Sequence, residues 1–333
     1  MRVSRRVLAL ACVLGATLVA GCGEKQEGGG EGPTPYRVAL DFYVNPDHAG
    51  LLTALERGYF ADAGLEVETR VPSDPSAPIR QVAAGNVDLA ISYEPEVLLA
   101  RDQALPVKAV AALVPRPLTS LISLPEAGIR KVAALRGKTI ATAGIPYQAD
   151  FLDSILAPVG LGLDDVRQVD VGFGLLPAVL SGRADAMLGG FLNIEGVDLE
   201  ERGEDPRVVP VDKLGVPTYD ELVLVASTEA IESDPEPIRL FIAALERGTR
   251  EAARDPAAAS EVVLEAGDGL EPDLTRAEVE RTLPLLLPDR GSDPYGYMDP
   301  REWERFAGFF ADRGLTEQRL SADELLTNEL LPE

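Results

Sequence analysis

Polar and aromatic side chains able to bind a small molecule gather after a short apolar strand near the start of the chain. Residues 38–42 (VALDF) are expected to form a buried strand, and a turn then leads into a helix over residues 48–57. In an open α/β sheet, small ligands bind beyond the carboxyl ends of strands, where loop groups and helix N-termini converge. We therefore expect ligand contacts at this junction from Asp41, Tyr43, Asn45 and His48.

Similar positions later in the chain add carboxylates, amides and aromatic rings. Ser92, Tyr93 and Glu94 follow an expected strand at residues 87–91. Further candidates lie at expected helix starts and in strand-to-helix loops: Tyr147, Phe173, Asn193, Glu195, Tyr219 and Glu221. Lys and Arg stand only at the edges of these segments, whereas an anion site usually presents Arg forks or a Lys. Carboxylates facing rings suit a flat heterocycle that bears an amine, because the acids accept from the amine and the rings stack on its face.

Catalytic and metal-binding patterns are missing from the sequence. His48 is the only histidine, so a His-rich metal site is excluded, and no G-x-S-x-G nucleophile turn occurs. Gly137, Lys138 and Thr139 imitate the end of a phosphate loop, but Val132 stands where that loop needs glycine, and a strand rather than a helix is expected after them. We therefore expect no catalytic residue, no metal and no cofactor.

The N-terminus has the pattern of an exported lipoprotein. Three Arg precede an apolar run over residues 7–20, which is shorter than the roughly 20 residues that span a bilayer. The run ends in LVAGC, so we expect a signal peptide at residues 1–21 and lipidation of Cys22, with an ordinary cleaved signal as the alternative. Residues 22–35 are rich in glycine and predict a flexible tether. The expected location is the extracytoplasmic face of the cell membrane, held by a lipid anchor.

Charge and cysteine content agree with this location. The leader holds three of the 31 Lys and Arg and none of the 55 acids, so the remaining chain has 28 basic groups and a net charge of −27. Such a chain repels nucleic acid, and we expect no nucleic-acid partner. Cys12 leaves with the leader and Cys22 would be acylated, so no thiol remains for a disulfide or a nucleophile.

An internal repeat divides the remaining residues into two α/β lobes. Residues 79–91 and 176–188 each read as a helix that ends at glycine, followed three residues later by aspartate and then a buried strand. The pairs Gly85 and Gly182, and Asp88 and Asp185, are each 97 residues apart. Strands expected upstream complete a β-α-β-α-β unit in each half, which is too long for a solenoid repeat.

Two long runs resemble a known family of transport proteins. DFYVNPDHAG, followed by GYFADAGLEV, closely resembles the opening of substrate-binding proteins of ABC importers for thiamine pyrimidine precursors and of their nitrate- and sulfonate-binding relatives; GVPTYDELVLVAS and GYMDPREWERF extend the similarity. The resemblance implies a two-lobed periplasmic-binding-protein-like fold of type II. It places lobe 1 at residues 36–124 and 222–333 and lobe 2 at 125–221, with hinge crossings at 121–125 and 220–223. It also implies a permease and an ATPase on separate chains.

The resemblance and the carboxylate-rich site together predict a non-enzymatic binding protein for a small heteroaromatic ligand. The expected ligand is a thiamine pyrimidine precursor of the hydroxymethylpyrimidine or formylaminopyrimidine type, with riboflavin, another heterocycle, nitrate or a sulfonate as alternatives. A different class is the pyrimidine synthase, an enzyme that shares the fold and consumes its own histidine. Synthases carry a cysteine-rich run where this chain reads residues 215–221 without cysteine. His48 is therefore expected to bind ligand or to cap a helix.

Overall fold

The computed structural model describes residues 34–288 and 293–332, which belong to one compact unit. The expected signal peptide, Cys22 and most of the expected tether lie outside the described residues. The tether was expected to reach residue 35, but β1 (Thr34–Ala39) already includes its last two residues, because they pair with β2 (Leu65–Arg70). Within the described ranges no helix combines the length and apolarity needed to cross a membrane.

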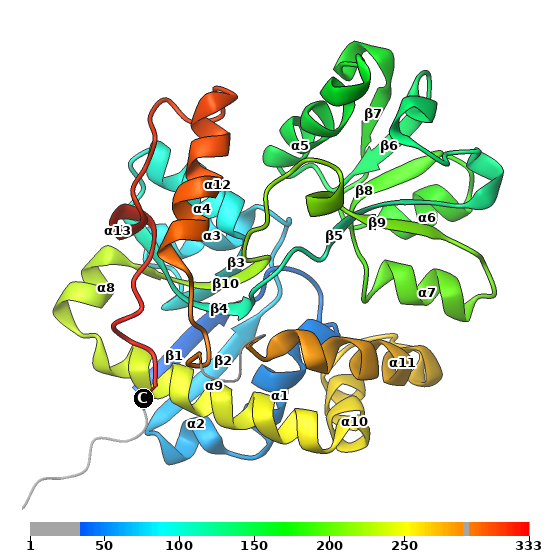
Figure 1. Cartoon of the computed structure of the whole chain (residues 1–333). Coiled ribbons are helices and arrows are strands. Elements are labelled where there is room, and N and C mark those ends of the chain that lie inside the picture. The colour runs from blue at the N-terminus through cyan, green and yellow to red at the C-terminus, as the bar shows by residue number, and fades with distance from the viewer. Residues whose placement is uncertain (1–33, 289–292, 333) are drawn as a thin grey trace, which may run out of the picture. The chain divides into compact units, whose positions relative to one another are not determined.

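The first sheet contains five strands in the order β2-β1-β3-β10-β4 (Figure 1). Besides β1 and β2, these are β3 (Leu89–Ser92), β4 (Val107–Val114) and β10 (Leu222–Ser227). β1 is parallel to β2 and β3, whereas β10 is antiparallel to β3 and β4. Four of these five strands precede the second lobe in the chain, and β10 returns from it into an interior position of the sheet.

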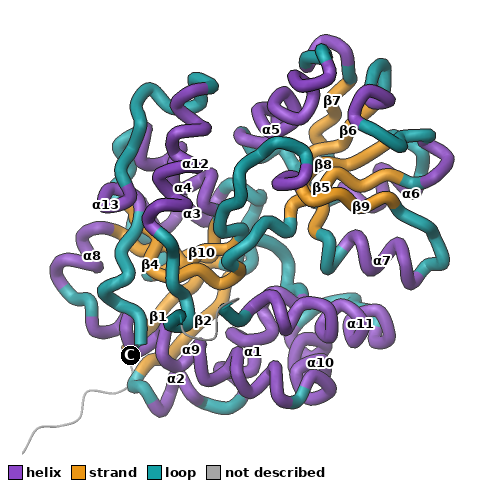
Figure 2. The backbone as a smooth tube through the Cα atoms, viewed as in Figure 1, coloured by secondary structure: helices purple, strands orange, loops and turns teal. Residues whose placement is uncertain are grey.

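Helices cover both faces of this sheet (Figure 2). α1 (Ala49–Glu56) packs on α9 (Glu236–Arg254), while α3 (Ala77–Ala83) and α4 (Glu94–Asp102) pack on the strands themselves. The others are α2 (Tyr59–Asp62), α8 (Thr228–Ser233), α10 (Pro256–Ala266), α11 (Pro272–Thr282), α12 (Pro300–Asp312) and α13 (Ala322–Leu325). On α12 the aromatic side chains of Trp303, Phe306 and Phe310 are buried. Phe306 and Phe310 also contact Phe151 of the second lobe.

The second sheet repeats the arrangement of the first, in the order β7-β6-β8-β5-β9. Its strands are β5 (Thr119–Ser123), β6 (Thr139–Thr142), β7 (Arg167–Asp170), β8 (Ala186–Phe191) and β9 (Arg207–Pro210). Its helices are α5 (Tyr147–Leu156), α6 (Leu175–Leu180) and α7 (Glu195–Glu201). In both sheets a parallel three-strand unit is extended by an antiparallel neighbour.

The strand pairing moves the expected first hinge crossing. We expected it at residues 121–125, but β5 pairs with β8 and β9 and so belongs to the second sheet. The chain therefore leaves the first sheet after Val114 and crosses at residues 115–118. The error arose because TSLIS is a short apolar strand that fits the interior of either sheet. The return crossing ends at Glu221, directly before β10 begins at Leu222, whereas the expected crossing at residues 220–223 reached into that strand.

The repeated aspartates, Asp88 and Asp185, hydrogen-bond to the neighbouring parallel strand of their sheet, β1 and β6 respectively. Asp88 accepts a hydrogen bond from the backbone N of Arg37 at 2.7 Å, and Asp185 accepts one from the backbone N of Thr139 at 2.8 Å. In each lobe the aspartate's own N–H donates back to the same residue's carbonyl. The glycine three residues earlier has a φ of 70° in both lobes, a conformation that favours glycine. The repeat thus encodes one structural device used twice.

Candidate functional site

A cavity of about 130 Å³ is lined by residues of both lobes. The segments after β1 and β3 contribute Asp41, Phe42, Tyr43, Val44, Asn45 and Tyr93; the second lobe contributes Thr119, Ala143, Ile145, Tyr147, Gln148, Leu175, Gly189, Phe191, Ile194 and Glu195. Most of these lie beyond the carboxyl ends of parallel strands, where α/β sheets bind ligands. Six residues predicted from sequence meet here: Asp41, Tyr43, Asn45, Tyr93, Tyr147 and Glu195.

Asp41 is held in the cavity wall by two donors. Asn45 donates its backbone N–H to His48 Nδ1 at 3.2 Å, so the proton of the neutral ring lies on Nε2, which donates to Asp41 Oδ1 at 2.9 Å. Tyr93 donates its hydroxyl to Asp41 Oδ2, also at 2.9 Å. Each carboxylate oxygen can accept more than one hydrogen bond, so Asp41 can still accept from a ligand. Its position is fixed before any ligand arrives.

Glu195 faces the cavity from the second lobe as the first residue of α7. Its Oε2 accepts a hydrogen bond from the backbone N of Phe191 at 2.7 Å, which holds the side chain back against the end of β8. Burial raises the pKa of Glu195 to about 7, although the backbone donors oppose the shift. Near neutral pH this carboxyl can therefore present either an acceptor or an acidic O–H.

Aromatic rings surround the two carboxyl groups. Tyr43 is 52% exposed, and its ring centroid lies 4.3 Å from that of Phe173. Phe173 also meets Phe42 edge to face at 4.4 Å, so it supports the aromatic rim without lining the cavity. Tyr93 and Tyr147 are buried, and burial raises the pKa of both phenols well above 10, so both remain protonated. These rings offer flat apolar surface together with hydroxyl groups.

Sequence reasoning missed the wall formed by Gln148, Ala143 and Gly189. Gln148 Oε1 accepts from the backbone N of Ala143 at 2.8 Å, which orients the amide so that its nitrogen lies beside Gly189. A Cβ on Gly189 would meet that nitrogen at 2.3 Å, and the glycine has a φ of 113°. Both facts require glycine here. The glycine pair in the segment GGFLN was the available signal, because glycine inside a strand marks close approach of another group.

Seven candidate residues lie outside the cavity lining: His48, Ser92, Glu94, Phe173, Asn193, Tyr219 and Glu221. His48 orients Asp41, as described above. Ser92 is fully buried and donates to Glu96 at 2.8 Å. Asn193 is also fully buried and contacts groups of the first lobe. The structure thus places these polar groups behind the cavity wall, where they position other residues.

Glu221 joins the two hinge crossings. Its Oε2 accepts from the backbone N–H groups of Leu118 and Thr119, each at 2.7 Å, and from the Tyr219 hydroxyl at 3.0 Å. Its Oε1 accepts from the Thr119 hydroxyl at 2.9 Å. Burial raises the pKa of Glu221 to about 7, with all of these donors opposing the shift. One carboxyl group of the return crossing therefore satisfies the backbone of the outgoing crossing, next to the cavity residue Thr119.

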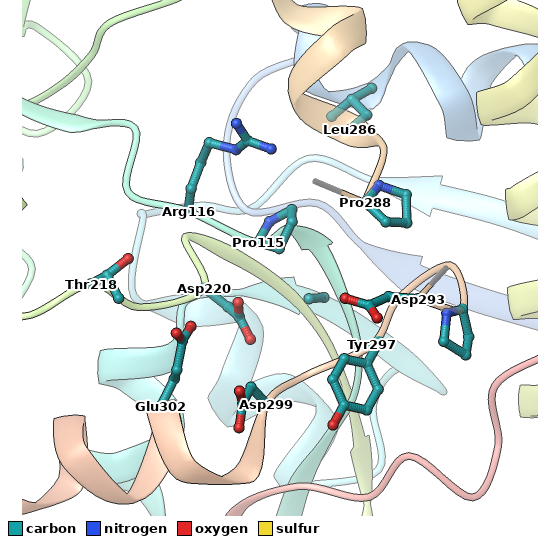
Figure 3. A pocket seen from close by; sticks show the side chains of 13 residues that line it. Pro115, Arg116, Thr218, Asp220, Leu286, Pro288, Asp293, Tyr297, Asp299 and Glu302 are labelled. Atoms are coloured by element: carbon teal, nitrogen blue, oxygen red, sulfur yellow. The ribbon is translucent and has the colours of Figure 1, made fainter. Parts of the chain in front are cut away.

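A larger cavity of about 220 Å³ lies beside the crossings (Figure 3). Pro115, Arg116, Thr218 and Asp220 of the crossings line it, together with first-lobe residues including Asp299. Its walls include no strand end of the second sheet and, among the described residues, one aromatic ring, that of Tyr297. Of these two cavities, only the smaller one joins both lobes at the strand ends, which makes it the candidate site. The described residues contain no cluster of side chains able to hold a metal ion.

Two lobes of mixed α/β sheet, joined by two crossings around a cavity, define the type II periplasmic-binding-protein fold. The alkanesulfonate-binding protein SsuA from Xanthomonas axonopodis pv. citri, solved bound to MOPS, superposes with a TM-score of 0.70 at 18% identity, covering 90% of this chain and 99% of that one. At this identity the similarity shows the fold.

Sequence comparison identifies the family. Residues 45–259 match the family model described as NMT1/THI5 like, and the chain belongs to this family. A formylaminopyrimidine-binding protein from Halalkalibacterium halodurans is 33% identical over 322 residues, which cover 96% of this chain and 97% of the relative. A 4-amino-5-hydroxymethyl-2-methylpyrimidine phosphate synthase from Aspergillus parasiticus is 28% identical over 66% of this chain and 67% of its own. Binding proteins and synthases are both represented among the relatives.

Proposed function

We propose that this chain is the substrate-binding component of an ABC importer and that it binds a thiamine pyrimidine precursor of the formylaminopyrimidine or hydroxymethylpyrimidine type. The observation that carries the proposal is a cavity with one carboxyl group from each lobe, Asp41 and Glu195, surrounded by aromatic rings. No Lys or Arg occurs among the lining residues that the structure describes. The relative from Halalkalibacterium halodurans supports the choice of ligand.

An aminopyrimidine complements the state of Glu195. The heterocycle presents an amino donor beside a ring-nitrogen acceptor on one edge. A protonated carboxyl group presents the reverse pair, an O–H donor beside a carbonyl acceptor. Because the pKa of Glu195 is about 7, the protonated form is available near neutral pH. Asp41, already held by two donors, can accept from a second amine or amide of the ligand.

The size and charge of the cavity disfavour the alternative ligands. Nitrate or a sulfonate would face carboxyl groups without a neighbouring Arg or Lys in the described lining. A flavin has three fused rings and is a drug-sized ligand, and such ligands occupy pockets of about 300–1,000 Å³. A cavity of about 130 Å³ suits a single substituted ring. The cavity chemistry therefore favours a pyrimidine.

The surroundings of His48 favour binding over synthase activity. Both of its ring nitrogens are engaged, with Asn45 and with Asp41, and the ring is buried beneath the cavity wall. A histidine that is consumed as a substrate must leave such a position. The segment over residues 215–221 also lacks the cysteines that synthases are expected to carry there.

Calorimetry on the purified protein tests the proposed ligand. Formylaminopyrimidine and 4-amino-5-hydroxymethyl-2-methylpyrimidine should bind, whereas nitrate should not. Asp41→Asn should weaken binding by about 1.5–3 kcal/mol, the range for hydrogen bonds to charged groups. Glu195→Ala, which removes both the O–H donor and the carbonyl acceptor, should weaken it by about 1–3 kcal/mol, whereas Glu195→Gln keeps a donor beside an acceptor and should bind nearly like wild type. Glu201→Gln, at the exposed end of the same helix as Glu195, is the matched control and should bind like wild type. Binding of nitrate or a sulfonate without binding of the pyrimidines would overturn the proposal.

We also propose that Cys22 anchors the protein to the extracytoplasmic face of the membrane, with the permease and ATPase as separate chains. The motive is the LVAGC sequence before a glycine-rich segment. Cys22→Ser should abolish incorporation of radiolabelled palmitate while leaving ligand binding intact. Equal palmitate labelling of the two proteins would refute the anchor.

A further inference from the structure

A buried amide of the second lobe contacts two groups of the first. Asn193 lies between β8 and α7, and its Nδ2 donates to Asp47 Oδ1 and to Thr282 Oγ1, both at 2.8 Å. Asp47 lies in the turn after β1, and Thr282 is the last residue of α11. All three side chains are buried, and α7 packs against α11 around them. We name the contact of Asn193 with Asp47 and Thr282 the latch.

The latch leaves two oxygen atoms without donors. Asp47 Oδ2 and Asn193 Oδ1 are both buried, and neither has a hydrogen-bond partner among the described residues. A buried acceptor without a partner destabilises the structure that holds it, and more so when it is charged. A proton on Asp47 removes the charge and converts one of these acceptors into a donor. The geometry of the latch therefore favours a protonated Asp47.

Carboxyl groups from three elements face this region. Asp41 and Glu195 lie near Asp47, and Glu278 of α11 interacts with Asp47, Glu195 and Asp198 of α7. Acids thus approach one another from both lobes across a buried contact. Like charges brought together away from water destabilise the ionised forms.

The positive groups in the region are few or already paired. His48 adjoins Asp47 on the same turn but is engaged with Asp41. Arg202 pairs with Asp198 on α7, and Arg281 of α11 reaches Glu200 at 3.5 Å at an exposed position. The remaining elements packed against the turn are α1, α10 and residues 283–286; their acids, Glu56, Glu261 and Glu265, are exposed.

We propose that the latch is proton-dependent, so that lobe closure takes up protons and ligand release is favoured at alkaline pH. Glu278 belongs to the same switch, because it lies on α11 against the acids of α7. The role in ligand release rests on the proposed function. The proton dependence of closure itself does not, and it can be measured without ligand.

The sign of the effect follows from burial. Desolvation and neighbouring carboxylates raise the pKa of Asp47 to about 7 and that of Glu278 to about 8. When the lobes part, both groups regain water and their pKa values fall toward the ordinary values of 3.8 and 4.5. Between about pH 4 and pH 8 the closed state therefore binds more protons than the open state. Raising the pH through 7 to 8 shifts the population toward the open state.

Distance measurements between the lobes test closure directly. Spin labels at Arg183→Cys and Glu232→Cys, both exposed, report the separation in a background with Cys12 and Cys22 replaced by Ser. In the absence of ligand the longer-distance population should grow between pH 5.5 and 8.5. Glu278→Gln should reduce this growth, and Asp47→Asn with Glu278→Gln should abolish it. Glu280→Gln, at an exposed position of the same helix, should behave like wild type.

Ligand binding provides the second readout. The Kd for formylaminopyrimidine should rise at least fivefold from pH 6 to pH 8.5, and less in Glu278→Gln; titration of the ligand itself is common to all variants and cancels in the comparison. Asn193→Ala should weaken binding at every pH. If circular dichroism shows that Asn193→Ala does not fold, the pH dependence of binding by Glu278→Gln still tests the latch. Identical pH profiles in wild type and the double variant would overturn the latch and leave the proposed function intact. Failure to bind any pyrimidine would overturn the proposed function, while the distances between the spin labels would still test the proton dependence of closure.

Discussion

Replacing Glu221 tests whether one carboxyl group holds the two crossings together. In Glu221→Ala the backbone N–H groups of Leu118 and Thr119 lose their acceptor inside the protein. Each unsatisfied buried donor costs about 1–3 kcal/mol, so two cost about 2–6 kcal/mol. The hydroxyl groups of Thr119 and Tyr219 can rotate to other partners and are left out of this sum. At roughly 2–4 °C per kcal/mol, the Tm should fall by roughly 4 °C or more.

Glu221→Gln separates lost hydrogen bonds from lost charge. Its amide oxygen can accept from both backbone N–H groups, and its NH₂ can donate to the Thr119 hydroxyl, so the cost should be only about 1–2 kcal/mol. Because the pKa of Glu221 is raised to about 7, lowering the pH stabilises the folded wild type through this group but not the Gln variant, so the difference in Tm between them should widen from pH 8 to pH 6. Thermal unfolding measures both variants, with Glu232→Ala as an exposed control. An alanine variant as stable as wild type, or a glutamine variant as damaged as alanine, would refute the clamp.

Two further predictions concern the cavity wall and the buried acids. Gly189→Ala should weaken binding of formylaminopyrimidine at least tenfold, about 1.4 kcal/mol, because the added Cβ would displace Gln148. Gly196→Ala is the control, because its Cβ would lie 3.4 Å from the nearest neighbouring atom. Unchanged affinity in Gly189→Ala would contradict the proposed geometry of the cavity wall. The protein should be more stable at pH 5.5 than at pH 8, because the folded state binds more protons than the unfolded state across this window. The responsible acids, with pKa values of about 7 to 8, are Asp47, Glu96, Glu195, Asp220, Glu221 and Glu278. Thermal unfolding in 1 M salt, which screens general repulsion to about 3 Å, should retain the trend; a higher Tm at pH 8 would contradict it.

Sequence patterns predicted the strands that build the site, because hydrophobic periodicity and turn residues such as Gly, Pro and Asn reflect local structure. The segment before Asp41 forms β1 and the next turn leads into α1, and Tyr147 begins α5. Residues at the carboxyl ends of parallel strands could therefore be assigned to one cavity before the lobes were seen. Asp41, Tyr43 and Glu195 meet there.

Some predicted residues do not line the cavity because they hydrogen-bond to buried groups elsewhere in the protein. A sequence pattern does not show which buried groups need such partners. Glu221 has the residue type and the sequence position of a ligand contact, yet it accepts hydrogen bonds from the backbone N–H groups of Leu118 and Thr119. The sequence placed the first crossing after these residues, because it did not show that β5 belongs to the second sheet. Asn193 is likewise engaged by the other lobe. Conversely, Thr119 and Leu175 line the cavity through tertiary packing, without a local signal. The apolar and small residues of a cavity wall resemble ordinary core residues in sequence.

The interior position of β10 has a consequence for how the chain assembles during synthesis. β4 pairs in the first sheet with β10 alone, and β10 emerges only after the whole second lobe. Until then VKAVAALV is an apolar strand with both edges open, a segment prone to wrong pairing and attractive to chaperones. All strands of the second sheet, in contrast, lie between Thr119 and Pro210 and can pair as soon as they are made. The lobe encoded second is therefore the first that can finish folding, and the return of β10 completes the lobe that was begun earlier.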